Sequence, residues 1–146
     1  MRKQDRNANT GDAEPVLIPV SIGELIDKIT ILEIKSERIA DTAKLLNIRY
    51  ELDLLRAVWE EHRMVDPAID ALSNSLKKTN ETLWRVEDDI RECERRQDFS
   101  PRFIELSRAV YRNNDERAAL KHKIDTLAKS AIIGEKSYAP ARDSLG

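Results

Sequence analysis

The stretch from Asp66 to Pro101 carries the most regular apolar pattern in the chain and constrains the fold most. Mostly apolar side chains recur there at alternating steps of three and four residues, the spacing of one face of an α-helix. Asp66-Pro67 marks the start, because Asp accepts free backbone N–H groups and proline suits the first helical position. The pattern predicts a helix of roughly 45 Å that ends near Gln97. Its repeat is Ile69, Leu72, Leu76, Thr79, Leu83, Val86, Ile90 and Cys93.

A first helix is predicted to begin near Ile22, after the short extended segment PVLIPV. Ser21 and Glu24 have the spacing of a capping box, in which each side chain satisfies a free backbone N–H. The apolar stripe of this helix is Ile22, Leu25, Ile29, Leu32, Ser36 and Ile39. Ile31 and Ile34 point almost the opposite way, so we expect the helix to pack on two sides, as a central helix or at an oligomer interface.

Two further helices complete the pattern. Asp41-Thr42 can cap a second helix that runs to about Met64, although no Gly or Pro separates it from the first, so one continuous helix stays open. Ser100-Pro101 predicts a fourth helix to about Ala128. Short connections between long helices favour antiparallel neighbours. The sequence therefore predicts an all-α fold, an antiparallel bundle of about four long helices with coiled-coil-like packing.

The chain is expected to form one domain over residues 15–139. Residues 1–14 are polar, carry both charge signs and lack an apolar anchor, so they predict a disordered N-terminal tail. The C-terminal stretch predicts irregular structure that becomes a flexible tail over residues 140–146. Only 4 Gly, 5 Pro and 5% aromatic residues accompany abundant Leu, Glu, Lys and Ala, which indicates a mostly helical protein with almost no sheet.

Composition argues against several classes of function. The 25 basic and 27 acidic residues lack the basic excess that nucleic-acid binding requires. Cys93 is the only cysteine, and no apolar run resembles a signal peptide or a membrane span, so we expect a cytoplasmic protein without membrane insertion. His62 and His122 have no Cys or His at zinc-ligand spacing, and no phosphate-binding loop is present. We therefore expect neither a metal nor a cofactor.

The fourth helix interrupts its own apolar repeat with polar residues. Asn113 and Arg117 occupy consecutive positions of the repeat Phe103, Leu106, Val110, Asn113, Arg117, Leu120, Ile124 and Leu127, and a slip of one residue replaces Asn113 by Asn114. A buried charge needs a partner. Glu33 lies within the apolar stripe of the first helix and about eleven residues from its start, the same height as Arg117 in an up-down-up-down bundle.

These positions predict a buried polar layer of Glu33, Thr79, Asn113 or Asn114, and Arg117. One interpretation is that the layer fixes the register of the helices. The other is a ligand or catalytic site, with Lys28 added, in which Arg and Asn hold a small anionic molecule between helices. An error in the assumed helical register is the third possibility.

A second possible anion site lies at the end of the bundle. The N–H groups that follow Ser21, including that of Gly23, emerge from a helix N-terminus with partial positive charge. The fourth helix should deliver Lys136 and Tyr138 to the same end. The alternative, which we favour, is that the C-terminal tail straps the bundle, with Tyr138 packed on Ile18 or Val20.

Four segments together resemble a family of uncharacterised bacterial helical proteins: IPVSIGELIDKITILEIKSERI, LWRVEDDIRE, FIELSRAVYRNNDERAALKHKI and EKSY. The resemblance spans Ile18 to Tyr138. It implies a context, because some members of that family are encoded beside or fused to glycosyltransferases of surface polysaccharide assembly. It implies no activity and supplies no catalytic residues.

Two hypotheses for function follow. The first is a non-catalytic cytoplasmic helical interaction module, a homo-oligomer, most simply a homodimer, that binds a protein partner in a cell-envelope glycan system. The alternative is a small helical-bundle enzyme or sensor that binds an anionic metabolite through the buried Arg, Asn and Glu layer. Enzymatic activity stays open, and the lack of a catalytic motif favours the first hypothesis.

Overall fold

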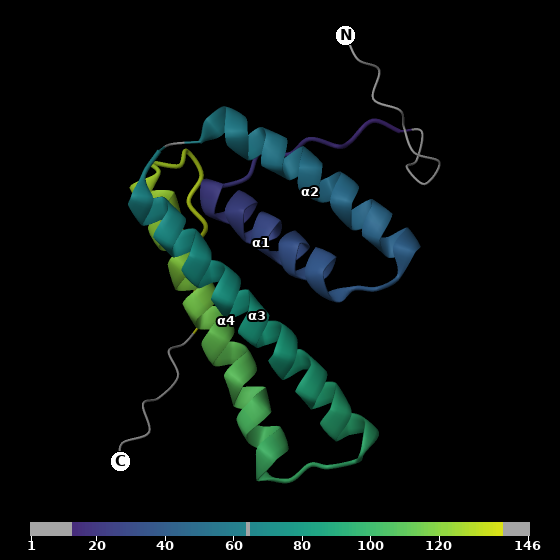
Figure 1. Ribbon diagram of the computed structural model, residues 1–146. Coiled ribbons are helices and arrows are strands. Elements are labelled where there is room, and N and C mark those ends of the chain that lie inside the picture. Colours follow the sequence, from purple (N-terminus) through teal and green to yellow (C-terminus); the bar gives the residue numbers. More distant parts are fainter. Residues whose placement is uncertain (1–12, 64, 139–146) are drawn as a thin grey trace.

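The structure, a computed structural model, describes residues 13–63 and 65–138. These residues form four helices without a strand: α1 (Ile22–Arg38), α2 (Thr42–His62), α3 (Pro67–Arg95) and α4 (Pro101–Leu127) (Figure 1). The predicted all-α fold of four helices is confirmed, and the first two helices are separate. Most of the predicted N-terminal tail and the C-terminal tail over residues 140–146 lie outside the described residues.

Local capping residues set three of the four helix starts. Ser21 Oγ accepts a hydrogen bond from the Glu24 N–H, and the Asp41 side chain accepts one from the Lys44 N–H. The cap at Asp41 starts α2 as a helix separate from α1. Asp66 caps α3 with proline in the first turn, whereas Ser100 makes no side-chain cap bond. The Glu24 carboxylate bonds Lys121 of α4 instead of completing a capping box. The first turn of α1 is therefore tied to α4.

The helices form two antiparallel pairs. α1 pairs with α2, and α3 pairs with α4 in a longer hairpin whose far end extends beyond α1 (Figure 1). α1 contacts all three other helices, so its two apolar faces are both used within the chain. α2 packs along α1 only, although Trp59 near its end also reaches the core between α1, α3 and α4. The prediction that α1 packs on two sides is confirmed, with α1 in the central position.

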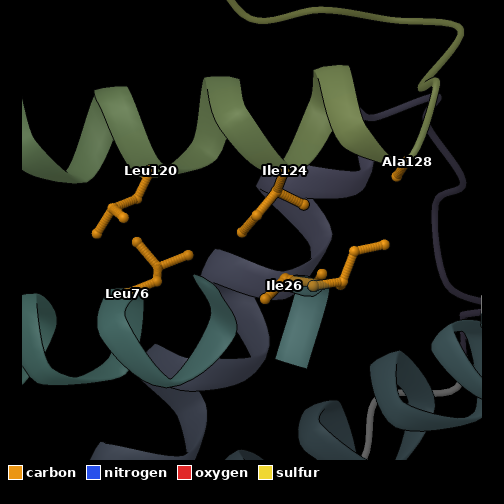
Figure 2. Close-up of a cluster of buried hydrophobic side chains, with 6 residues drawn as sticks. Ile26, Leu76, Leu120, Ile124 and Ala128 are labelled. Atoms are coloured by element: carbon orange, nitrogen blue, oxygen red, sulfur yellow. The ribbon is translucent and has the colours of Figure 1, made fainter. Parts of the chain in front are cut away.

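Two clusters of buried side chains make up the core. The first joins α1, α3 and α4, and Figure 2 shows Leu120, Ile124 and Ala128 of α4 pointing toward Leu76 and Ile26. The second cluster lies between α1 and α2 and contains Leu25, Ile29, Leu32, Ile48 and Leu52. Both clusters surround α1. The core is therefore concentrated at one end of the α3–α4 hairpin.

Candidate functional site

The centre of the molecule is a buried carboxylate, Asp27 of α1, which is 0% exposed. Arg117 of α4 binds it with two nitrogens: Nε lies 2.9 Å from Oδ1 and Nη2 lies 2.5 Å from Oδ2. Asn80 of α3 donates from Nδ2 to the same Oδ1 at 2.9 Å. One carboxylate therefore connects three helices through paired, charge-assisted hydrogen bonds.

A second group of polar side chains completes this network. Thr30 Oγ1 donates to the Asp27 carbonyl at 2.8 Å and accepts from Asn80 Nδ2 at 3.0 Å. Lys121 Nζ lies 2.8 Å from Glu24 and 3.9 Å from Asp27. Within the described residues every buried side-chain nitrogen and oxygen has a hydrogen-bond partner. The network is therefore complete without a bound molecule.

The electrostatics of the network keep Arg117 charged. Its hydrogen bonds to Asp27 raise the guanidinium pKa, burial opposes this by desolvating the cation, and the charge of Asp27 raises the pKa further. A buried ion pair of this kind contributes little net stability over an apolar pair of the same volume, but loss of one partner leaves a buried charge uncompensated. The pair is therefore a strong constraint on how α1 and α4 dock.

Glu33 is not the acid that meets Arg117, so the predicted pairing is wrong. Glu33 bonds Arg56 of α2 at 3.0 Å and Lys77 of α3 at 3.4 Å. The physical reason is the central position of α1, since Glu33 lies on the side of α1 that turns toward α2 and α3, about 120° around the helix from Asp27. Asp27 lies on the side that turns toward α4 and takes the predicted role.

The other predicted members of the layer are only partly brought together. Asn114 Oδ1 lies 3.5 Å from Arg117 Nη1, whereas Asn113 donates to a carbonyl of its own helix. Thr79 is half-buried, and its neighbour Asn80 takes its place in the network. The reason is that α3 packs on α4 with one side and on α1 with another, and adjacent residues of a helix lie about 100° apart. Lys28 is exposed and lies 3.8 Å from Glu24.

The sequence did carry a signal for Asp27. At about 100° per residue, Asp27 falls on the same face of α1 as Gly23, Thr30 and Ile34. All four residues are buried. When a helix packs on two sides, an acidic residue on its second buried face predicts a buried ion pair.

The predicted anion site at the N-terminus of α1 is occupied by a side chain of the protein itself. Asp125 of α4, 1% exposed, accepts the Gly23 N–H at 2.6 Å, and Ser130 Oγ accepts the Ile22 N–H at 3.2 Å. Ser21 accepts the Glu24 N–H. The prediction of an open site for an external anion is therefore wrong, because an internal carboxylate already uses the helix N-terminus.

Lys136 and Tyr138 do not lie at that end of the bundle either. Gly134 N–H donates to Asp125 at 3.1 Å, and Lys136 Nζ lies 2.6 Å from Asp115, so the tail runs back along α4 as a strap. The Lys136 ammonium lies 5.1 Å from the centre of the Tyr138 ring, a cation–π contact. Tyr138 is 80% exposed, so the expected packing on Ile18 or Val20 is wrong.

A groove opens beside the buried network, between the end of α1 and the α3–α4 hairpin. Its volume is about 470 Å³, within the range of ligand and peptide sites. Ile31 and Ile34 of α1 and Leu83 and Trp84 of α3 supply apolar walls. Arg117, Asn80 and Asn114 close one part of it, and Lys35, Glu87, Asp88 and Arg91 supply further charges. The groove is therefore amphipathic and touches the network through Arg117.

The remaining candidate chemistry is sparse in the described part of the chain. Cys93 is buried in the α3 seam. Residues 13–63 and 65–138 contain no cluster of three His, Cys, Asp or Glu side chains arranged as metal ligands. None of the four described helices combines the length and apolar character that a bilayer span needs.

Comparison with known sequences places the chain in a family. The family of unknown function DUF6165 matches residues 16–144, and the chain belongs to it. No curated protein and no solved structure matches the chain.

Proposed function

We propose that this member of the family of unknown function DUF6165 is a non-catalytic helical interaction module. It acts in the bacterial cytoplasm as a homodimer and binds a protein partner of a cell-envelope glycan system. The observation that carries the proposal is the amphipathic groove between α1, α3 and α4. The envelope context rests on the sequence resemblance to proteins encoded beside glycosyltransferases.

The groove lies where the α3–α4 hairpin loses its third helix. At the end covered by α1, Leu76 and Ile124 are fully buried. Farther along the hairpin, Leu83 and Trp84 are only half-buried and face the groove. An amphipathic helix from a partner, laid into this groove, would continue the packing that α1 provides. Helix-in-groove recognition of this kind uses apolar anchors with charged residues at the edges.

The charged rim supplies the means of selecting a partner. Arg91 bonds Glu87, whereas Lys35 and Asp88 have no ion-pair partner within residues 13–63 and 65–138. Charges at the edge of an interface set its orientation and specificity more than its strength. We expect the partner helix to offer an acid to Lys35 and a base to Asp88.

Co-purification from the native host tests the module. The tagged wild-type chain should recover a glycosyltransferase or another envelope glycan enzyme. Two groove variants, Trp84→Ala and Lys35→Glu, should each lose that enzyme. Ile104→Ala, on the exposed face of α4, should retain it. Failure to recover any glycan enzyme with the wild-type chain, or its recovery with both groove variants, would contradict the proposal.

A second function is favoured by one feature of the same groove. Arg117 uses Nε and Nη2 for Asp27, which leaves Nη1 beside Asn114 at the groove wall. With Lys35 this edge could bind the carboxylate or phosphate of a small anionic metabolite, in a sensor or an enzyme.

Thermal-shift screening against nucleotide sugars and carboxylate metabolites separates the two functions. A ligand whose stabilising effect disappears in Lys35→Ala supports metabolite binding. Lys35 is preferred to Arg117 as the test position because its removal leaves the buried ion pair intact. A flat screen, combined with groove-dependent recovery of a glycan enzyme, supports the module.

A further inference from the structure

α2 carries an apolar stripe that no described part of the chain covers. Leu46, Tyr50, Leu54 and Val58 follow one another at steps of four residues and are 38%, 46%, 38% and 42% exposed. At about 100° per residue they lie opposite the face of α2 that packs on α1. An amphipathic surface helix normally has a polar outer face. The outer face of α2 is therefore built for contact.

The charges along α2 are divided between its two halves. The first half, Thr42–Tyr50, contains two basic residues and no acid, whereas the second half, Glu51–His62, contains four acids and one base. That one base, Arg56, is bonded to Glu33 of α1. Lys44 and Arg49 have no ion-pair partner among the described residues, and the same is true of Asp53 and Glu61.

We propose that the outer face of α2 binds the same face of a second copy of this chain, with the two α2 helices antiparallel. An antiparallel pair related by a two-fold axis places the basic half of each helix against the acidic half of the other. With the axis beside Leu52, Leu46 of one copy meets the level of Val58 of the other, and Tyr50 meets Leu54. Arg49 then lies near the level of Asp53, and Lys44 near that of Glu61.

The self-complementary pattern is what identifies the occupant. A two-fold contact uses one surface twice, so a charge on that surface is stabilised when the opposite charge lies near the mirrored level of the same helix. In the antiparallel arrangement Lys44 comes near Glu61 and Arg49 near Asp53, whereas parallel pairing would set base against base and acid against acid. The apolar stripe supplies the association energy, and the charges select the orientation. The inference rests on the proposed homodimer and does not involve the groove.

A charge-swap experiment tests this surface. An acidic variant, Lys44→Glu with Arg49→Glu, and a basic variant, Asp53→Lys with Glu61→Lys, change only exposed side chains. Each variant alone faces like charges in the antiparallel dimer, so its dissociation constant should rise by roughly 100-fold or more. An equimolar mixture should form a heterodimer, because every altered position then meets an opposite charge. Sedimentation velocity over a range of concentrations measures all three samples, and circular dichroism checks that each variant is folded.

Two further samples complete the design. Leu54→Glu places a charge in the apolar stripe and should give a monomer, whereas Ile104→Glu, on the exposed face of α4, should remain a dimer. A dimer that survives both charge variants, or a mixture that stays monomeric, overturns the α2 surface but leaves a dimer through another surface possible. A wild-type chain that is monomeric at all concentrations overturns the homodimer itself. Loss of an envelope enzyme from the α2 variants, with the wild type monomeric, assigns the face to a different protein and likewise overturns the inference.

Discussion

The two halves of the α3–α4 hairpin have the same sequence pattern but different surroundings. In the half that α1 covers, Ile69, Leu76 and Ile124 are at most 1% exposed. In the far half, Val86 and Cys93 are buried on α3, and no residue of α4, all of which is described, is buried before Leu120. The difference shows that a helical repeat predicts which face is turned inward and leaves open how many neighbours cover it.

The buried ion pair lies where these two environments meet. Asn80 and Arg117 belong to the covered half, yet both also line the groove that leads toward the far half. The buried polar side-chain atoms of the described residues all have hydrogen-bond partners, and the Arg117 side chain stays 29% exposed. Substitutions in the covered half should therefore change mainly the stability of the fold, and substitutions along the groove should change mainly binding.

The largest effect is expected from Arg117→Met. It leaves the Asp27 carboxylate, 0% exposed, without its bidentate partner, which should lower the free energy of unfolding by roughly 3–5 kcal/mol. Urea denaturation measures the loss. Lys77→Met, which also removes a cation that bonds acids of α1, should lose about 1 kcal/mol or less because its ion pairs are solvent-accessible. Equal losses in the two variants would contradict the special position of Asp27.

The double variant Asp27→Leu with Arg117→Met sharpens the same comparison. Because an apolar pair of similar volume can replace a buried ion pair, the double variant should recover much of the stability lost in Arg117→Met. If it folds but pairs α1 and α4 in more than one register, as judged from the dispersion of its NMR spectrum, the network serves to specify the structure. No recovery of stability would show that the buried amide of Asn80 depends on the carboxylate for its hydrogen bond.

A matched pair of core truncations tests the contrast between the halves directly. Ile124→Ala removes a fully buried side chain from the cluster in Figure 2 and should cost about 3 kcal/mol. Leu106→Ala, at a half-buried position of the α4 repeat in the far half, should cost about 1 kcal/mol. Thermal and urea denaturation compare the two. A cost at Leu106 as large as that at Ile124 would mean that the far half is covered in solution, as a dimer or a bound partner would cover it.

The contact between the N-terminus of α1 and α4 predicts a smaller effect at Gly23. A Cβ at this position would clash with the Lys121 carbonyl oxygen and lie 2.8 Å from Asp125 Oδ1. Gly23→Ala should therefore lose roughly 1–3 kcal/mol despite the better helix propensity of alanine. Gly134→Ala is the matched control, since the nearest atom to its Cβ lies 3.9 Å away. A neutral Gly23→Ala would mean that α1 can move off α4 without cost.

Gly23 also shows the limit of what the sequence could predict. The helix starts at Ser21, Asp41 and Asp66 were predictable because capping involves residues within one turn of each other. The polar layer was predictable in kind, because Arg117 falls in an apolar repeat. Its acid partner and the occupation of the α1 N-terminus by Asp125 depend on where α1 crosses the hairpin. No local pattern fixes that crossing.

The smallest expected effect lies at the far tip of the hairpin and depends on pH. The hydroxyl and the backbone N–H of Ser100 donate to the Asp98 carboxylate and hold its pKa below the ordinary value. Because the pKa is lowered in the folded state, this contribution to stability is present above the unfolded pKa of about 3.9 and is lost as the pH falls through the folded pKa. Asp98→Asn should therefore be slightly less stable than wild type at pH 7 and equal to it at the acid end of the range.

Hydrogen exchange tests whether the effect of Asp98→Asn is confined to one half of the molecule. If the far half opens independently of the covered half, Asp98→Asn should speed exchange of amides near the α3–α4 turn and leave those of Leu76 and Ile124 unchanged. The same rates measured in a concentrated sample report whether anything covers the far half, because a bound neighbour would protect its amides. Uniformly faster exchange along both helices would instead mean that the hairpin unfolds as one unit, and that the contrast in burial between its halves has no counterpart in local stability.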